Sequence, residues 1–276
     1  MDREYALNSA TDLGRRQLDY LEALLDPHTK RSLDHLGLRP GMRCLDVGAG
    51  GGSITRWLAD QVAPDGTVVA VDIDTKWMAG LDDYPGVEVY RHDINTGPPV
   101  PGRFDVIHVR LVLMHLARRR DVLRRLVAAL APGGALVVGD FTGPRQRVLT
   151  APSAADQRLY LRVQEVAHAY VAREYPISYT WAHEIDESLA GAGLVDVQGT
   201  EYSFTATGGE VACLLHRNYV QQLEDQLIAK SELTRADLDR YGDLMLDPRF
   251  RGWFYTFVSG SGRRPWYGER RRSDSA

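Results

Sequence analysis

The feature that most constrains the fold of this sequence is a cluster of glycines between an apolar run and a helical pattern. The loop Asp46-Val47-Gly48-Ala49-Gly50-Gly51-Gly52-Ser53 follows the run 42–47, and residues 53–62 have the spacing of a helix. Glycines permit a tight turn and let a ligand approach the backbone. The helix that follows begins with N–H groups that have no partner within the helix. The sequence predicts a strand–loop–helix unit that can hold a ligand, although such loops also serve as purely structural turns.

The alternation of expected strands and helices around this loop predicts an α/β protein. Expected strands lie at 42–47, 67–71, 87–90, 104–111 and 135–138, with helices at 53–62 and 117–130; a later helix at 183–192 and strands at 195–204 and 253–259 complete the pattern. Apolar strands that alternate with helices are typical of a parallel sheet covered on both faces. We therefore expect a seven-stranded, mostly parallel sheet with helices on both faces.

The segments outside this alternating pattern predict parts of the protein other than the sheet and its covering helices. Thr11 is expected to cap a helix that stops at Asp26-Pro27, and a second helix is expected at 28–36. The interruptions 142–182 and 206–250 carry helical patterns at 156–173, 211–230 and 234–247, after a loop-like stretch at 142–155. The expected organisation is an N-terminal helical cap (1–37), a core (38–141, 183–205 and 251–267), lid insertions (142–182 and 206–250) and a disordered tail (268–276).

Composition excludes several classes of function. The formal net charge is −4 and the pI about 6.1, so there is no overall basic surface for nucleic acid. No apolar run approaches the roughly 20 residues of a membrane span, and the N-terminus is polar rather than signal-like. Two distant cysteines, Cys44 and Cys213, favour a reduced, cytoplasmic protein. We expect a small-molecule partner, no nucleic acid and no membrane.

Three carboxylates near the ends of the predicted strands indicate the chemistry of the expected ligand. Asp72 ends the second strand at close to the roughly 20 residues after the glycines that suit an acid on a ribose diol. Asp93 follows the third strand, where an adenine amino group would lie. Asp46 precedes the glycines and would repel a pyrophosphate but attract a cation. These residues predict an adenosine that carries positive charge and no pyrophosphate.

Five motifs occur in the order typical of one family. They are Cys-Leu-Asp-Val-Gly-Ala-Gly-Gly-Gly at 44–52, Val-Val-Ala-Val-Asp-Ile-Asp at 68–74, Arg-His-Asp-Ile at 91–94, Phe-Asp-Val-Ile-His-Val-Arg at 104–110 and Leu-Ala-Pro-Gly-Gly at 130–134. Over about residues 40–140 the chain therefore resembles the class I S-adenosylmethionine-dependent methyltransferases. The segments at Tyr5 and 38–41 are similar to bacterial small-molecule methyltransferases of menaquinone and ubiquinone biosynthesis, and 262–265 is similar to the ends of natural-product methyltransferases.

The resemblance implies a Rossmann-like fold, S-adenosylmethionine as cofactor and a set of cofactor-binding positions. Gly48 and Gly50 would face its methionine part, and Asp46 would lie near the ammonium. Asp72, with Ile73 beside it, would hold the ribose. The remaining positions are Asp93 and Ile94 at the adenine, Val109 and Arg110 beside the methionine part, and Tyr5 closing over the cofactor. Arg110 departs from the smaller or acidic residue usual at its position.

Candidates for catalysis are His115 after the fourth strand and His168 and Tyr170 on the helix 156–173. Each has a packing role as its alternative, and the spacing of His168 and Tyr170 turns them to different faces. Catechol-type relatives that use a metal carry acids at the ends of the fourth and fifth strands. Here the fourth ends in Val109-Arg110, so no catalytic metal is expected.

The predicted function is methyl transfer to O, N or an electron-rich carbon of a small aromatic or apolar natural product. Tyrosines and a tryptophan in the two insertions would form a dry acceptor pocket. The alternative is a cyclase or rearrangement enzyme that binds the same cofactor without net methylation. A homo-oligomer through the N-terminal helix or the lid helices is a further expectation.

Overall fold

The computed structural model describes residues 7, 11–98, 100–144 and 147–266. Its central sheet has seven strands in the order β3-β2-β1-β4-β5-β10-β7. They are β1 Arg43–Val47, β2 Thr67–Asp72, β3 Val87–Arg91, β4 Phe104–Arg110, β5 Leu130–Phe141, β7 Val195–Tyr202 and β10 Phe257–Arg263. Strand β10 is antiparallel to both β5 and β7, and the other pairs are parallel. The expected seven-stranded, mostly parallel sheet is confirmed.

Helices cover both faces of this sheet because successive strand residues point to opposite sides. On β1, Cys44 packs into one core cluster with Ile54 and Leu58 of α2 (Ser53–Val62). Its neighbour Leu45 packs into the other cluster, which includes α3 (Arg119–Ala129) and α5 (Trp181–Gly191). Short 3-10 turns η1 (Lys76–Met78), η2 (Ile94–Thr96) and η3 (Leu113–His115) follow β2, β3 and β4. The carboxyl ends of the parallel strands thus form one edge lined by loops.

The N-terminal cap is one helix, α1 (Asp12–Asp34), and the prediction of two helices separated at Pro27 is wrong. Thr11 caps it as expected, accepting a hydrogen bond from the Gly14 N–H. A proline inside a helix removes one backbone hydrogen bond and crowds the preceding turn. Tertiary contacts on that turn offset the cost, because Arg110 binds both Asp26 and Thr29 across the proline.

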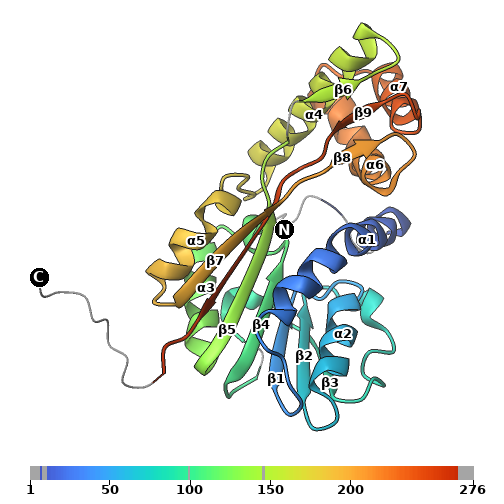
Figure 1. Cartoon of the computed structure of the whole chain (residues 1–276). Coiled ribbons are helices and arrows are strands. Elements are labelled where there is room, and N and C mark those ends of the chain that lie inside the picture. The colour runs from blue at the N-terminus through green and yellow to red at the C-terminus, as the bar shows by residue number, and fades with distance from the viewer. Residues whose placement is uncertain (1–6, 8–10, 99, 145–146, 267–276) are drawn as a thin grey trace, which may run out of the picture.

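A second body rises beyond the carboxyl edge of β5 (Figure 1). It contains α4 (Ala154–Glu174), α6 (Val211–Lys230) and α7 (Arg235–Leu244), together with a three-stranded sheet in the order β6-β9-β8. The strands of this small sheet are β6 (Val148–Thr150), β8 (Thr205–Thr207) and β9 (Arg251–Trp253). We call this body the lid. The capping box at Thr234 and Asp237 begins α7 as predicted.

Two predicted segments are corrected in the lid. The stretch expected to be a loop at 142–155 contains β6, and the single strand expected at 253–259 is two strands in two different sheets. Phe254 and Thr256 are buried between β9 and β10, so the chain turns there from the small sheet into the large one. Alternation of large and small residues indicates extended backbone, but it does not say which sheet each strand joins.

Candidate functional site

The glycine loop joins β1 to α2 at the carboxyl edge of the sheet. Gly48 and Gly50 have left-handed backbone angles, with φ of 71° and 58°, a conformation that favours glycine. A Cβ at Gly48 would collide with Val112 after β4. The Gly48 N–H donates to the Val71 carbonyl at 2.8 Å, which holds the loop against β2. The predicted strand–loop–helix unit is therefore confirmed.

Asp72 lies at the end of β2 beside this loop. Its Oδ2 accepts from the Gly50 N–H at 3.0 Å and its Oδ1 accepts from the Asp74 N–H at 3.1 Å. Burial raises the pKa of the carboxyl, and these backbone hydrogen bonds oppose that rise. Each carboxylate oxygen can accept more than one hydrogen bond, so the carboxylate retains capacity for two hydroxyl donors.

An apolar and acidic surface continues from Asp72 along the edge. Ile73 is 51% exposed, which is unusual for so large an apolar side chain. Asp93 is exposed and caps η2 by accepting from the Asn95 N–H at 2.9 Å. Ile94 is only 5% exposed and packs in the core. Of the two isoleucines predicted at the ligand, Ile73 offers the larger free surface.

Asp46 is buried beneath the loop and its hydrogen bonds are internal. Its Oδ2 accepts from the Thr55 hydroxyl at 2.6 Å and its Oδ1 from His108 Nδ1 at 2.8 Å. Burial alone would raise the pKa of Asp46, but the bonds from His108 and Thr55 hold it below its ordinary value. Asp46 is 2% exposed, so direct contact with a ligand ammonium would require exchange of one of these bonds.

Two further predicted positions lie at the end of β4. Val109 is fully buried in the core. Arg110 donates to Asp26 at 2.9 Å and to Thr29 at 3.0 Å, and thereby ties β4 to α1. Tyr5 lies outside the described residues, and its role stays a prediction.

Helix α1 lies against the glycine loop and brings two residues that the sequence did not single out. A Cβ at Gly51 would collide with Glu22 Oε1 and come within 3.3 Å of Arg15 Nη1. Burial raises the pKa of Glu22, and the nearby Asp26 raises it further, while Arg15 and Arg110 oppose the rise. The available signal was spacing: Glu22 lies four residues after Leu18 and three before Leu25, on an otherwise apolar stripe of the helix.

The three catalytic candidates occupy different surroundings. His115 ends η3, and burial, with Arg119 nearby, lowers its pKa to about 4. His168 and Tyr170 are both buried on α4. Tyr170 has Arg173 and Lys230 near its ring at 5.6 and 5.7 Å. His168 instead faces aromatic rings of the lid, so the expectation that these two residues face different ways is confirmed.

His168 belongs to a group that we call the lid cluster, whose members are His168, Gln164, His216, Tyr179, Tyr219 and Tyr255. The His168 ring lies 5.2, 5.1 and 5.4 Å from the rings of Tyr179, Tyr219 and Tyr255. Tyr255 in turn lies 5.6 Å from the ring of Phe141, the last residue of β5. The lid cluster therefore begins at the carboxyl edge of the sheet.

Hydrogen bonding fixes the tautomer of His168. Its Nδ1 lies 2.7 Å from the Gln164 carbonyl oxygen, which can only accept, so Nδ1 carries the proton. Burial lowers the pKa of His168 to about 4, and the ring is neutral near pH 7. Nε2 is consequently left as a proton acceptor within the lid cluster.

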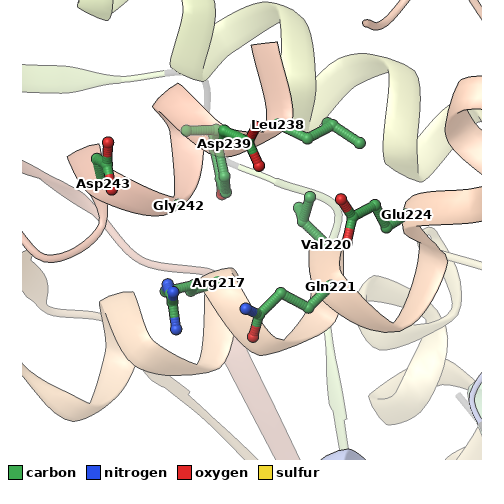
Figure 2. Close-up of a pocket in the computed structure, with 9 residues that line it drawn as sticks. Arg217, Val220, Gln221, Glu224, Leu238, Asp239, Gly242 and Asp243 are labelled. Carbon is green, nitrogen blue, oxygen red and sulfur yellow. The ribbon is translucent and has the colours of Figure 1, made fainter. Parts of the chain in front are cut away.

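A separate pocket of about 280 Å³ lies in the lid between α6 and α7. Figure 2 shows Arg217, Gln221 and Glu224 of α6 opposite Asp239 and Asp243 of α7. None of the predicted site residues lines this pocket. Among the described residues there is also no group of three or more His, Cys, Asp or Glu placed to hold a metal ion, and no helix with the length and apolarity needed to cross a membrane.

The topology and the acid-lined glycine edge define a nucleoside-binding α/β protein, and comparisons refine that class. A family model described as "Methyltransferase domain" matches residues 45–136. The ubiquinone/menaquinone biosynthesis C-methyltransferase UbiE of Vibrio parahaemolyticus is 31% identical over 201 residues, covering 68% of this chain and 75% of the relative. Its counterpart from Ectopseudomonas mendocina is 34% identical, covering 41% and 47%. The chain belongs to the class I S-adenosylmethionine-dependent methyltransferases.

The fold agrees with solved structures of this class. Phosphoethanolamine N-methyltransferase 2 of Haemonchus contortus, in complex with phosphomonomethylethanolamine and S-adenosylhomocysteine, has a TM-score of 0.57. That similarity covers 94% of this chain and 58% of the other, at 17% identity. Matches to several curated relatives span less than half of the relative's length, between 39% and 47%.

The residues at the edge fit S-adenosylmethionine, the cofactor of this family. Asp72 has the acceptor capacity that a ribose diol would need, and the exposed Ile73 has an apolar surface on which an adenine ring could pack. Asp93 and Glu22 are acidic side chains, which would suit a cationic ligand.

Proposed function

We propose that this chain transfers the methyl group of S-adenosylmethionine to a small aromatic or apolar acceptor held between the sheet edge and the lid. The acceptor atom is O, N or an electron-rich carbon. The observation that carries the proposal is Asp72, which is held by the Gly50 N–H at the carboxyl edge with the exposed Ile73 beside it. Ligands of open α/β sheets bind at this edge.

Each predicted cofactor residue has a part in this proposal. Asp72 accepts from the ribose hydroxyls and Asp93 accepts from the adenine amino group. Ile73 packs on the adenine ring, while Ile94 supports this part of the site from the core. Gly48 and Gly50 admit the methionine part.

Three predicted residues act indirectly in this proposal. Asp46 accepts hydrogen bonds from His108 and Thr55, and these bonds fix β1, β4 and α2 beneath the loop. Val109 and Arg110 position the neighbouring strand and α1.

When bound, S-adenosylmethionine supplies an activated methyl group on a positively charged sulfur. The chain's own residues then need to align the acceptor and exclude water, which in favourable intramolecular cases is worth roughly 7–11 kcal/mol. Phe141 and the tyrosines of the lid cluster form an apolar wall beyond the end of β5. A ring stacked on this wall would lie near the cofactor edge and away from bulk solvent.

His168 is the residue that we assign as general base. Its Nδ1–H is fixed by the Gln164 carbonyl, so Nε2 accepts the proton that an acceptor hydroxyl or amine loses. A base in this position contributes on the order of 10²–10⁴-fold. His115, on η3 with its pKa lowered to about 4, is the second candidate. Tyr170 is buried beside Arg173 and Lys230 and faces a different way from His168.

Strand pairing supports the following boundaries for the two parts of the proposed enzyme. The cofactor-binding part contains 38–141 with α5, β7 and β10, and α1 covers it. The lid contains 142–182 and 206–250 and includes the flanking strands β8 and β9, because both pair within the small sheet.

The test is to supply S-adenosylmethionine with a panel of phenols, hydroquinones and aromatic amines. The proposal predicts a product heavier by one methyl group, with S-adenosylhomocysteine released in equal amount. A rearranged product of unchanged mass, with no S-adenosylhomocysteine, would instead indicate the cyclase. Absence of S-adenosylhomocysteine binding in calorimetry would contradict the cofactor assignment itself.

A further inference from the structure

Glu22 is a partly buried carboxyl over the glycine loop, near Arg15 and Arg110, which favour its charged form. Its Oε1 is inaccessible to solvent and has no hydrogen-bond partner among the residues that the structure describes. The same atom lies over Gly51, where a side chain would collide with it. A buried polar atom without a partner destabilises a fold by roughly 1–3 kcal/mol. A position on the apolar stripe of α1 would be better filled by leucine unless the carboxylate binds something.

The two neighbouring acids already have partners. Asp46 accepts from His108 and Thr55. Asp26, one turn after Glu22, accepts from Arg110 at 2.9 Å. Glu22 is therefore the acid over the loop that is available to a cation from outside the chain.

Arg15 adds a positive group on the same side of Gly51. Its Nη1 would lie 3.3 Å from a Cβ at Gly51, and its side chain is 36% exposed. It forms an ion pair with Asp19 at 2.8 Å, and an exposed pair of this kind contributes only about 0–1 kcal/mol. Arg15 can therefore exchange Asp19 for a ligand carboxylate at little cost.

We propose that α1 recognises the amino-acid end of the cofactor, with Glu22 binding the α-ammonium and Arg15 the α-carboxylate. The inference rests on the proposed function and deepens it. A single acid over the loop would attract the ammonium but repel the carboxylate, whereas the two side chains together match both charges. This assigns to the cap helix the ammonium contact that the sequence predicted for Asp46.

Calorimetry with three adenosine ligands tests the pair. S-adenosylhomocysteine carries both the ammonium and the carboxylate, decarboxylated S-adenosylmethionine carries only the ammonium, and 5′-methylthioadenosine carries neither. Glu22→Gln should weaken the first two at least tenfold and leave the third within twofold. Arg15→Gln should weaken S-adenosylhomocysteine at least fivefold and leave decarboxylated S-adenosylmethionine within twofold.

Asp34→Asn is the matched control, because Asp34 is an exposed acid at the end of the same helix. It should change none of the three affinities. Gly51→Ala is a second variant, because its methyl group displaces the Glu22 carboxylate while the flexible side chain can move aside; it should reproduce the pattern of Glu22→Gln.

The outcomes separate this inference from the function on which it rests. Equal losses for all three ligands, or no loss for S-adenosylhomocysteine, would overturn the assignment of Glu22 while leaving the cofactor assignment intact. Failure of the unaltered protein to bind any of the three would overturn the proposed function instead.

Discussion

The cofactor edge and the lid differ in how their key residues are brought together. At the edge, Gly50 and Asp72 belong to consecutive β–α units, and one hydrogen bond of 3.0 Å joins them. In the lid cluster, His168 meets Tyr179, Tyr219 and Tyr255, and these four residues come from four separate segments. The edge is built by local chain geometry, and the lid by packing between distant segments. Variants at the two places should therefore fail in different ways.

The largest effect is expected in the lid. His168→Asn keeps an amide that can donate to the Gln164 carbonyl and removes Nε2, so kcat should fall by about 10²–10⁴-fold with little change in affinity for S-adenosylhomocysteine. Kinetic assays measure kcat, and calorimetry measures the affinity for S-adenosylhomocysteine. His183→Asn, at an exposed histidine of α5, is the control. An unchanged kcat would make His168 a packing residue and direct attention to His115.

The pH profile sharpens this assignment. Burial lowers the pKa of His168 to about 4, and the base must be unprotonated to accept a proton. Activity that depends on His168 should therefore be lost only as the pH falls through about 4, and no histidine-dependent inflection near 6.5 is expected. An inflection near 6.5 that disappears in His168→Asn would show that the ring is more accessible to water than its contacts indicate.

The second-largest effect is expected in the free energy of unfolding. It concerns Asp140 near the end of β5, between the cofactor edge and the lid. Burial raises the pKa of this fully buried carboxyl to about 8, although the Trp181 Nε1–H donates to it at 2.9 Å. The folded state keeps the proton while the unfolded chain loses it near pH 4, so the free energy of unfolding should decline as the pH rises from about 4 to about 8. One unit of pKa difference corresponds to about 1.4 kcal/mol, so the decline should be on the order of several kcal/mol.

Asp140→Asn resembles the protonated acid and should remove most of that pH dependence. Denaturant unfolding at pH 5 and pH 8 measures it. Glu187→Gln, at an exposed acid of α5, should retain the full slope. Equal slopes in Asp140→Asn and the unaltered protein would mean that Asp140 ionises in the folded state as readily as in the unfolded chain.

The third-largest effect is expected in the affinity for the cofactor and tests the sheet edge that carries Asp72. Asp72→Ala removes the acceptor of the ribose hydroxyls and the anchor of the Gly50 N–H, so affinity for S-adenosylhomocysteine should fall at least tenfold. Calorimetry with adenosine as a second ligand should show a similar loss, because the ribose is common to both. Asp74→Ala leaves the Gly50 bond in place and should have a smaller effect. Full affinity in Asp72→Ala would refute the ribose assignment.

The same contrast explains what the sequence could predict. The mostly parallel sheet, the glycine loop and the position of Asp72 follow from spacing, because a β–α unit brings residues about 20 positions apart to one edge. Glu22 escaped notice because its importance depends on α1 lying against Gly51, a contact between separate parts of the chain. Pro27 misled for a related reason: the bonds from Arg110 to the flanking turn form only in the folded protein.

The lid resisted prediction for the same physical cause. Strand β9 pairs with β6 and β8, which lie roughly 100 and 45 residues earlier in the chain, and no local pattern specifies such partners. The partners of His168 are likewise set by the crossing of α4 with α6 and with the segment before β10. What the sequence did predict correctly was that His168 and Tyr170 face apart, since that depends on helix geometry alone.

The smallest effect concerns Tyr5, which the resemblance assigns to closure over the cofactor. An aromatic ring beside a cation contributes about 0.5–1 kcal/mol at an exposed site, which is about a two- to fivefold change in affinity. Tyr5→Ala should therefore weaken S-adenosylmethionine, whose sulfur is positively charged, by that amount and leave S-adenosylhomocysteine, whose sulfur is neutral, nearly unchanged. Calorimetry with both ligands measures the difference. Equal weakening of the two would favour simple packing on the adenosine, and no weakening would place Tyr5 outside the cofactor site.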